Sequence, residues 1–212
     1  MLSSFSILLV GFVLGMRHAT DPDHVVAVST IVSRQPKLAR ASAIGALWGV
    51  GHTATILLVG GAILVFRLTI PPRLGLAMEF AVAVMLILLG ILSLTRKGVS
   101  RLQSVMRPLF VGFVHGLAGS AFVAMLVLAA IPSPGLGIVY LSLFGFGTIV
   151  GMMLITLAIA TPAVLAARRF VRVQEYLRVA AGVASIVFGL MLAHQIGVVD
   201  GLFAATPNWT AK

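Results

Sequence analysis

The sequence predicts an all-α membrane protein of six transmembrane helices, and three observations favour this fold class. Hydrophobic residues make up 60% of the 212-residue chain and charged residues only 9%, a balance that does not suit a water-soluble domain. The apolar residues form runs long enough to cross the hydrocarbon layer of a bilayer as helices. These runs show no sustained polar and apolar alternation, so a helical bundle is favoured over a β-barrel. They cover residues 4–33, 39–66, 74–95, 108–131, 136–165 and 177–199.

The basic residues predict how these helices are oriented. The net charge of +10 would suit a nucleic acid, but the cations sit at helix ends, which indicates a lipid partner and no nucleic acid. Eleven lie between runs 1 and 2, 3 and 4, or 5 and 6: Arg34, Lys37, Arg40, Arg96, Lys97, Arg101, Arg107, Arg168, Arg169, Arg172 and Arg178. The opposite ends carry Arg67, Arg73 and Lys212. The positive-inside rule therefore places those three loops in the cytoplasm and both termini outside a bacterial-type cytoplasmic membrane.

The chain as a whole, residues 1–212, is predicted to form one transmembrane domain with a short outer tail at 201–212. The first run lacks a basic leading segment and carries charges at its centre, so we expect it to remain in the mature protein. Cysteine is absent, which excludes disulfides, thiolate metal sites and Fe–S clusters.

Three sequence matches predict an internal repeat. Val10–Gly15 returns as Val111–Gly116 after 101 residues, and Leu47–Gly51 corresponds to Leu143–Gly147 after 96 residues. A third match, Leu89–Ile91, returns 99 residues later. The order is preserved, so residues 1–100 and 101–200, approximately, would form halves of three helices with opposite topology, as in many secondary transporters. The glycine pairs in the first match are predicted to allow close helix packing.

The first apolar run contains a dense group of ionisable residues: Arg17, His18, Asp21, Asp23 and His24. Such groups are costly at membrane depth unless they line a polar cavity, pair with each other or bind a ligand. The Asp21-Pro22 step resembles a helix N-cap followed by proline at the first helical position, which predicts a break in this helix. A break in a span is typical of sites where transporters hold their cargo.

Imidazole and carboxylate together favour a transition-metal ion over Mg²⁺ or Ca²⁺. A salt bridge from Arg17 to Asp21 or Asp23 and a His/Asp proton relay remain alternative interpretations. His52, in the second run, is predicted at a depth similar to that of His24 and joins the candidate ligands.

A further set of residues is predicted to line the path or support the ligands. His115 lies in the fourth run, where the 101-residue offset places it opposite Leu14, and it either contacts the ion or hydrogen-bonds to Ser120 or a backbone carbonyl. The whole set comprises Arg17, Thr20, Thr53, His115 and Ser120.

These motifs resemble those of the nickel/cobalt transporter family. The segment from His18 to His24 fits the pattern H-x4-D-H, and Gly51-His52-Thr53 is similar to the family's Gly-His-Ser/Thr motif. The run from His115 to Ala121, HGLAGSA, resembles the version in nickel-transport-type urease accessory membrane proteins. The resemblance implies a permease for Ni²⁺ or Co²⁺, with the ion as cargo and no cofactor. Typical members have eight spans and a helix before the first motif, which leaves open a homodimer, a metallochaperone or a urease-maturation partner.

The predicted function is therefore secondary transport of a divalent transition-metal ion, and not enzymatic catalysis. The chain lacks a Walker-type phosphate-binding loop, so transport would follow ion gradients or depend on a partner. Three alternatives stay open: a metal-delivery accessory subunit, a proton-coupled exporter of a small anion that relies on Arg17, and an intramembrane metalloenzyme. The enzyme is the least favoured, because the motif differs from hydrolase motifs such as H-E-x-x-H.

Overall fold

A computed structural model describes residues 4–33, 35, 37–95, 101–131, 133–169 and 172–209 of the chain. The described part is helical and contains no strand, which confirms the predicted all-α class. The helices are α1 (Ser4–His18), α2 (Pro22–Val32), α3 (Leu38–Thr55), α4 (Gly61–Phe66), α5 (Pro72–Leu94), α6 (Arg101–Ala130), α7 (Pro134–Arg169) and α8 (Val173–His194), with π-helical turns η1 (Ile56–Gly60) and η2 (Gln195–Val199).

Four helical segments of the described chain are long and apolar enough to cross a membrane: Leu38–Phe66, Pro72–Leu94, Pro134–Ala166 and Val173–Val199. They correspond to the second, third, fifth and sixth predicted runs, and their mean hydropathy lies between 1.8 and 2.5. The first run is divided between the shorter helices α1 and α2, and α6 is a helix of 30 residues within which side chains 119–130 lie outside the described part. Six spans therefore remain a prediction.

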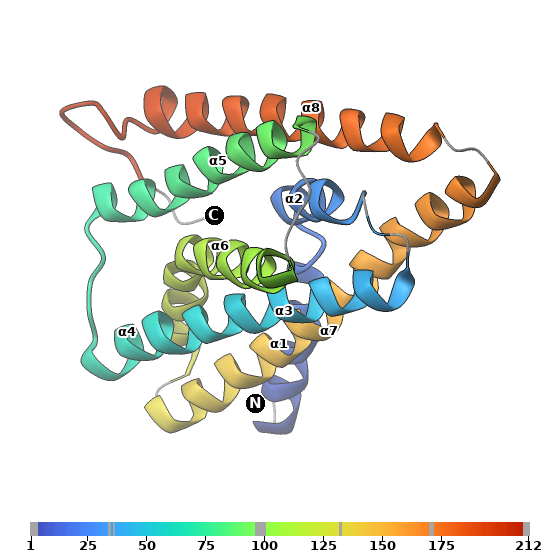
Figure 1. The fold of residues 1–212 in the computed structure, drawn as a ribbon. Helices are drawn as coiled ribbons and strands as arrows, with labels where there is room; N and C mark the ends of the chain where they lie inside the picture. Colours follow the sequence, from blue (N-terminus) through green and yellow to red (C-terminus); the bar gives the residue numbers. More distant parts are fainter. Residues whose placement is uncertain are drawn as a thin grey trace.

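The break between α1 and α2 falls at the predicted Asp21-Pro22 step. Asp21 is the N-cap of α2, with extended backbone angles (φ −60°, ψ 142°), and Pro22 takes the first helical position. Before it, the amide nitrogens of Thr20 and Asp21 donate to the carbonyls of Arg17 (2.8 Å) and His18 (3.1 Å), which closes the end of α1. As a result α2 leaves the axis of α1 and enters the centre of the fold (Figure 1).

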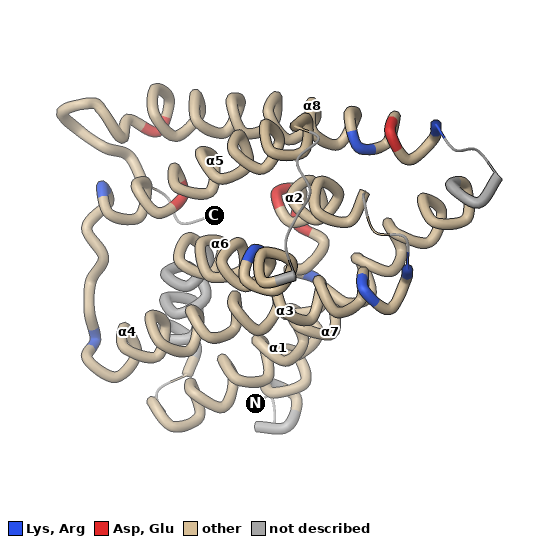
Figure 2. The backbone as a smooth tube through the Cα atoms, in the orientation of Figure 1, with Lys and Arg blue, Asp and Glu red and all other residues tan. Residues whose placement is uncertain are grey.

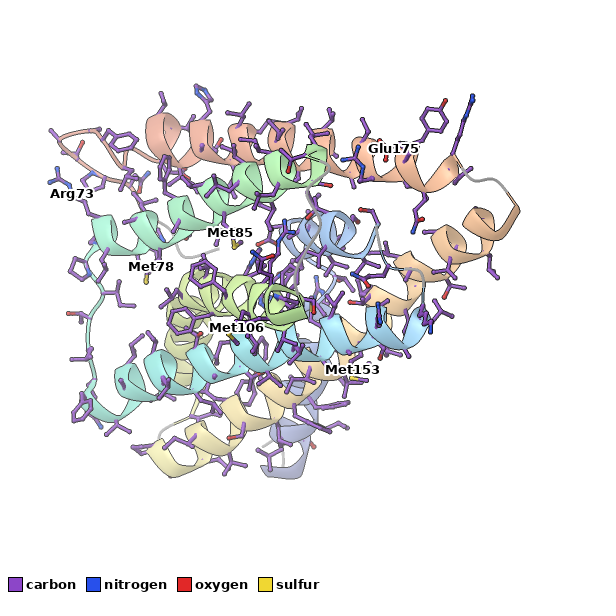
Figure 3. All side chains as sticks on the ribbon, in the orientation of Figure 1. Arg73, Met78, Met85, Met106, Met153 and Glu175 are labelled. Carbon is purple, nitrogen blue, oxygen red and sulfur yellow. The ribbon has the colours of Figure 1, made fainter. Side chains whose placement is uncertain are left out.

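The helices form two groups with α2 between them. Along one edge of the molecule α5 and α8 lie side by side (Figure 1), with Arg73 at the start of α5 and Glu175 at the start of α8 at opposite ends of the pair (Figure 3). In the other group α3 packs against both α6 and α7, and α1 packs on α7. Helix α2 contacts α5, α7 and α8. This arrangement surrounds the start of α2 with other helices.

Glycines allow the closest helix contacts, as predicted for this chain. A Cβ atom on Gly15 would meet the carbonyl oxygen of Phe144, and one on Gly112 would meet that of Trp48. These two contacts are equivalent in sequence, since Gly112 follows Gly15 by 97 residues and Phe144 follows Trp48 by 96. Two further pairs behave in the same way: Gly147 against Phe12 with Gly51 against Leu109, and Gly90 against Gly182 with Gly189 against Ala83. The contacts between helices therefore recur in matching pairs.

The described part of the tail folds back on α5. The indole nitrogen of Trp209 donates to Glu79 Oε1 (2.8 Å), and the Trp209 ring covers Gly75. Arg73 donates to the carbonyls of Ala204 (3.1 Å) and Ala205 (3.2 Å). Glu79 thus helps to hold the described part of the tail on α5.

Candidate metal site

Four histidine side chains gather where α1 ends and α2 begins. His18 is the last residue of α1, His24 lies in the first turn of α2, and His52 and His115 come from α3 and α6. The ring centres of His18 and His24 are 4.8 Å apart, as are those of His24 and His115, and His52 lies 5.3 Å from His24. The structure thus brings together three predicted ligands, His18, His24 and His52, with His115 beside them.

Three of these histidines are buried, and some of their ring nitrogens have no hydrogen-bond partner among the described residues. The exposed fractions of His24, His52 and His115 are 2%, 0% and 2%. Within the described part of the chain, Nε2 of His24 and Nδ1 of His52 have no hydrogen-bond partner, and Nδ1 of His24 and Nε2 of His115 form no hydrogen bond and have only the Asp23 carboxylate nearby. A buried polar atom without a partner costs about 1–3 kcal/mol, and native proteins rarely leave several such atoms together. The cluster therefore has the character of a site prepared for a ligand.

Two carboxylates orient the imidazole rings. Asp21 Oδ2 lies 2.7 Å from His18 Nδ1, and this contact leaves His18 Nε2 directed at His52 Nε2, 3.2 Å away. Asp23 lies between two rings, with Oδ1 3.2 Å from His24 Nδ1 and Oδ2 3.6 Å from His115 Nε2. A carboxylate that holds the second nitrogen of a metal-binding histidine fixes the ring and strengthens its bond to the metal. In Figure 2 the acidic start of α2 lies in the middle of the fold.

The distance between His18 Nε2 and His52 Nε2 suits a shared metal ion. With metal–nitrogen bonds of about 2.1 Å, two nitrogens 3.2 Å apart subtend an angle of roughly 100° at the ion, between the octahedral and tetrahedral values. One ligand atom from each of His18, His24 and His52 lies within 4.8 Å of the others, and the same holds for Asp21, Asp23 and His24. The donor set fits Ni²⁺, Co²⁺, Zn²⁺ or Cu²⁺ better than an alkaline-earth ion.

Close helix packing brings His52 and His115 into this cluster. Gly112 and Gly116 on α6 face the backbone of α3 at Trp48 and His52, so α6 approaches without intervening side chains. Thr55 Oγ1 donates to the carbonyl of Phe113 (3.2 Å) and Thr53 Oγ1 to that of Gly145 (2.9 Å), which ties α3 to both α6 and α7. Thr53 therefore supports the helix that carries His52.

Two aromatic residues that no sequence motif indicated, Trp48 and Phe144, also contact the histidines. The Trp48 ring is fully buried and lies 5.8 Å from His24 and 5.0 Å from His115, while the Phe144 ring lies 5.5 Å from His18. Trp48 precedes His52 by four residues, a spacing that places both side chains on one helix face and gives the available signal. These rings close the apolar side of the cluster.

The remaining predicted residues lie at its edge or outside it. Arg17 and Thr20 are exposed, and the Thr20 hydroxyl donates to the carbonyl of Arg17 (2.6 Å). Asp21 is paired with His18, so the described contacts do not favour the salt bridge to Arg17. His115 Nδ1 lies 3.1 Å from the carbonyl of Val111, one of the alternatives predicted for it. The Ser120 side chain lies outside the described residues, as do Arg34, Arg96 and Lys97.

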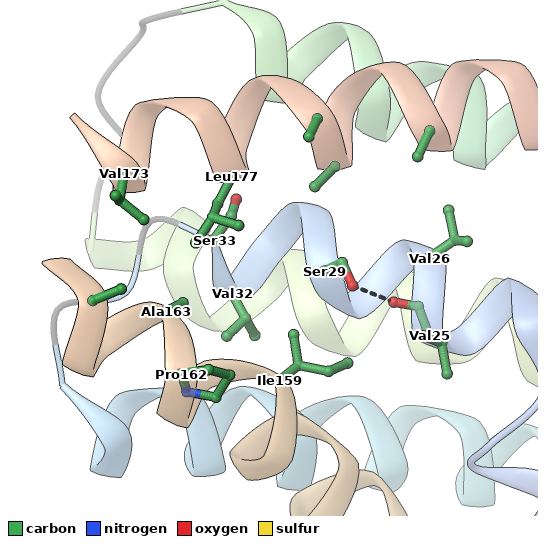
Figure 4. A pocket seen from close by; sticks show the side chains of 14 residues that line it. Val25, Val26, Ser29, Val32, Ser33, Ile159, Pro162, Ala163, Val173 and Leu177 are labelled. Atoms are coloured by element: carbon green, nitrogen blue, oxygen red, sulfur yellow. Dashed lines mark hydrogen bonds between the residues drawn. The ribbon is translucent and has the colours of Figure 1, made fainter. Parts of the chain in front are cut away.

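A separate pocket of about 510 Å³ opens between α2, α7 and α8 (Figure 4). Its walls are mainly apolar, including Val25, Ile159 and Leu177. Its two hydroxyls, on Ser29 and Ser33, donate to carbonyls of their own helix at 2.7 and 3.2 Å. The described residues that line the pocket thus offer an ion no strong ligand and do not extend the histidine cluster.

Apolar helices around a buried group of ionisable side chains define a polytopic integral membrane protein. The chain is 38% identical over 221 residues to the urease accessory protein UreH of Bacillus sp. (strain TB-90), a match that covers 93% of this chain and 95% of that protein. The chain therefore belongs to the UreH family of urease accessory proteins.

A second relative is the chloroplast protein FOR GROWTH AND FERTILITY 2 of Arabidopsis thaliana, 27% identical over 207 residues. That match covers 86% of this chain but spans only 54% of the plant protein. No family model matches the chain. No solved structure matches it either.

Proposed function

We propose that this protein carries a divalent transition-metal ion, Ni²⁺ or Co²⁺ first, across the cytoplasmic membrane. The observation that carries the proposal is the pair of Nε2 atoms of His18 and His52, 3.2 Å apart, in a cluster with His24, whose buried Nε2 has no partner among the described residues. His18, Asp21, Asp23, His24 and His52 would hold the ion or its ligands, and Thr53 and His115 would support them. Membership of the UreH family agrees with this cargo, because the motifs resemble those of nickel/cobalt transporters.

The proposed carrier is one domain of six spans built as an inverted repeat, with both termini outside. The matching pairs of glycine contacts support a two-fold relation between the halves. The offset of 97 residues between the contact residues of α1 and α6 equates His18 with His115, so each half would supply one histidine at an equivalent position. Secondary transporters bind their cargo at such an interface between repeats, where rocking of the halves exposes it to either side.

A metal-delivery subunit is the second candidate, because the relative from Bacillus is named an accessory protein. Such a subunit would bind the ion and pass it to a metallochaperone or another urease-maturation partner without moving it across the bilayer. The two functions share the site and differ in flux. Reconstitution therefore separates them.

The test is metal uptake by proteoliposomes that contain the purified protein and a metal-sensitive dye. We expect saturable Ni²⁺ or Co²⁺ flux in the wild type, little flux for Mg²⁺, and loss of flux in His24→Ala. His194→Ala is the matched control, because this histidine is exposed on α8 and remote from the cluster in sequence. Wild-type vesicles as tight as empty ones, with metal binding retained, would favour the delivery subunit.

Arg17→Ala tests the small-anion exporter in the same vesicles. We expect it to retain at least about half of the wild-type metal flux, because Arg17 is exposed and Asp21 is paired with His18. An exporter that relies on the Arg17 cation would show the opposite pattern, with Arg17→Ala inactive and His24→Ala active.

Acidification is expected to weaken metal binding. Imidazole binds a metal ion only in its neutral form, and carboxylate only when ionised, so protons compete with the ion at every ligand. Lowering the pH from about 7.5 to about 5.5 should therefore reduce Ni²⁺ affinity by at least about tenfold. Equilibrium binding in detergent measures this, and an affinity that does not change over the range would contradict a histidine-based site.

A further inference from the structure

The candidate ligands form two overlapping groups that share His24. One group combines His18, His24 and His52, and the other combines Asp21, Asp23 and His24. Within each group, one ligand atom per residue lies within 4.8 Å of the others. The first group supplies three nitrogens, whereas the second supplies two carboxylates and one nitrogen.

The contact between Asp21 and His18 keeps these groups from serving one ion together. Asp21 Oδ2 lies 2.7 Å from His18 Nδ1, while the nitrogen that faces His52 is Nε2, on the far side of the rigid ring. While Asp21 holds His18 in this orientation, it stands behind the imidazole and not beside an ion bound to Nε2. Asp21 is therefore a positioning residue for an ion at the histidines and a ligand only for an ion elsewhere.

The two groups of ligands also differ in how exposed their side chains are. The side chains of Asp21 and Asp23 are 46% and 29% exposed, whereas His24 and His52 are 2% and 0% exposed. An ion that comes from the accessible side meets the carboxylates first and reaches the fully buried nitrogens later. His24 belongs to both groups, and its Nε2 has no hydrogen-bond partner among the described residues, so it lies where the transfer would occur.

We propose that the site consists of two successive stations: an outer, oxygen-rich station of Asp21, Asp23 and His24, and an inner, imidazole station of His18, His24 and His52. This inference rests on the proposed function and specifies how the cargo is selected. The outer station accepts a partly hydrated divalent ion with little discrimination, because carboxylates also bind harder ions such as Mn²⁺. Transfer to the inner station replaces oxygen with imidazole ligands and so selects Ni²⁺ or Co²⁺.

When the ion moves inward, Asp21 returns to His18 Nδ1. The carboxylate then fixes the His18 ring and increases its basicity toward the metal. One side chain thus serves first as a ligand and then as a positioning residue. The two stations share His24, so an ion at the outer station competes with one at the inner station.

Two metals probe the stations separately in the purified full-length protein in detergent. Electron paramagnetic resonance follows Mn²⁺ binding, and X-ray absorption of bound Ni²⁺ reports imidazole against oxygen ligands. We expect wild-type protein to bind Mn²⁺, and Ni²⁺ to displace it and show an imidazole-rich shell. In His52→Ala, Mn²⁺ affinity should remain within about threefold of wild type. Ni²⁺ affinity should fall by more than about 100-fold, and the Ni²⁺ that still binds should have mainly oxygen ligands.

The double variant Asp21→Asn/Asp23→Asn should lose Mn²⁺ binding by more than about tenfold. Either of two results would overturn the inference. The first is that wild-type protein binds Ni²⁺ but no Mn²⁺, which can be measured without any variant. The second is that His52→Ala loses affinity for both metals to the same degree. Ni²⁺ flux in vesicles is a separate measurement. If both stations bind metal but the vesicles show no Ni²⁺ flux, the transport proposal fails while the two-station inference stands.

Discussion

Replacing His52 by alanine is expected to reduce Ni²⁺ affinity by more than about 100-fold, beyond the loss typical of residues that only orient ligands. His52 supplies the Nε2 atom that faces His18 Nε2 at 3.2 Å, and its side chain is fully buried. Without it, the two-nitrogen geometry that suits a metal ion disappears. Competition with a metal-binding dye in detergent measures the change.

A second substitution at this position separates loss of a ligand from loss of packing. His52→Gln fills a similar volume and offers no imidazole, so it should lose nearly as much Ni²⁺ affinity as His52→Ala. His194→Ala should bind as the wild type does, because His194 is exposed. Wild-type affinity in His52→Gln would show that His52 acts through packing and not as a ligand.

Much of the site's position was predictable from local sequence chemistry. Proline has no amide hydrogen and fits the first turn of a helix, so Asp21-Pro22 predicted a break that the structure contains. The depth comparison between His24 and His52 needed only the rise of a helix, and their rings do lie 5.3 Å apart. Their role as metal ligands stays a prediction.

Contacts between helices that are distant in sequence were harder to predict. The sequence match at 101 residues places His115 opposite Leu14, whereas the contact pairs support 97 residues, which places it opposite His18. Glycines four residues apart explain the difference, since a shift of one helical turn superposes Gly15 on Gly112 as readily as Gly11. Only the packing of these helices against a third helix distinguishes an offset of 97 residues from one of 101. The contact of Trp48 with His115 likewise depends on helix packing and could not be predicted from the sequence.

The second large effect is expected at the paired glycines. Gly112→Leu should destabilise the protein by about 1–3 kcal/mol, because a side chain there meets the Trp48 carbonyl, a backbone group that cannot rotate away. For a chain of this size the thermal midpoint should fall by roughly 3–10 °C. Fluorescence-detected thermal unfolding in detergent measures it. Ni²⁺ affinity should fall as well, because separating α6 from α3 moves His115 away from the other rings.

Gly15→Leu should produce a loss of similar size, since its contact with the Phe144 carbonyl corresponds to that of Gly112 with Trp48. Gly61→Leu is the matched control, because a Cβ at Gly61 would meet no atom within 4 Å. Equal losses at Gly15 and Gly112, with none at Gly61, are what a two-fold relation between the halves requires. If Gly112→Leu were as stable as Gly61→Leu, α3 and α6 would not be in close contact at Gly112, and His18 and His115 would not be equivalent positions of a repeat.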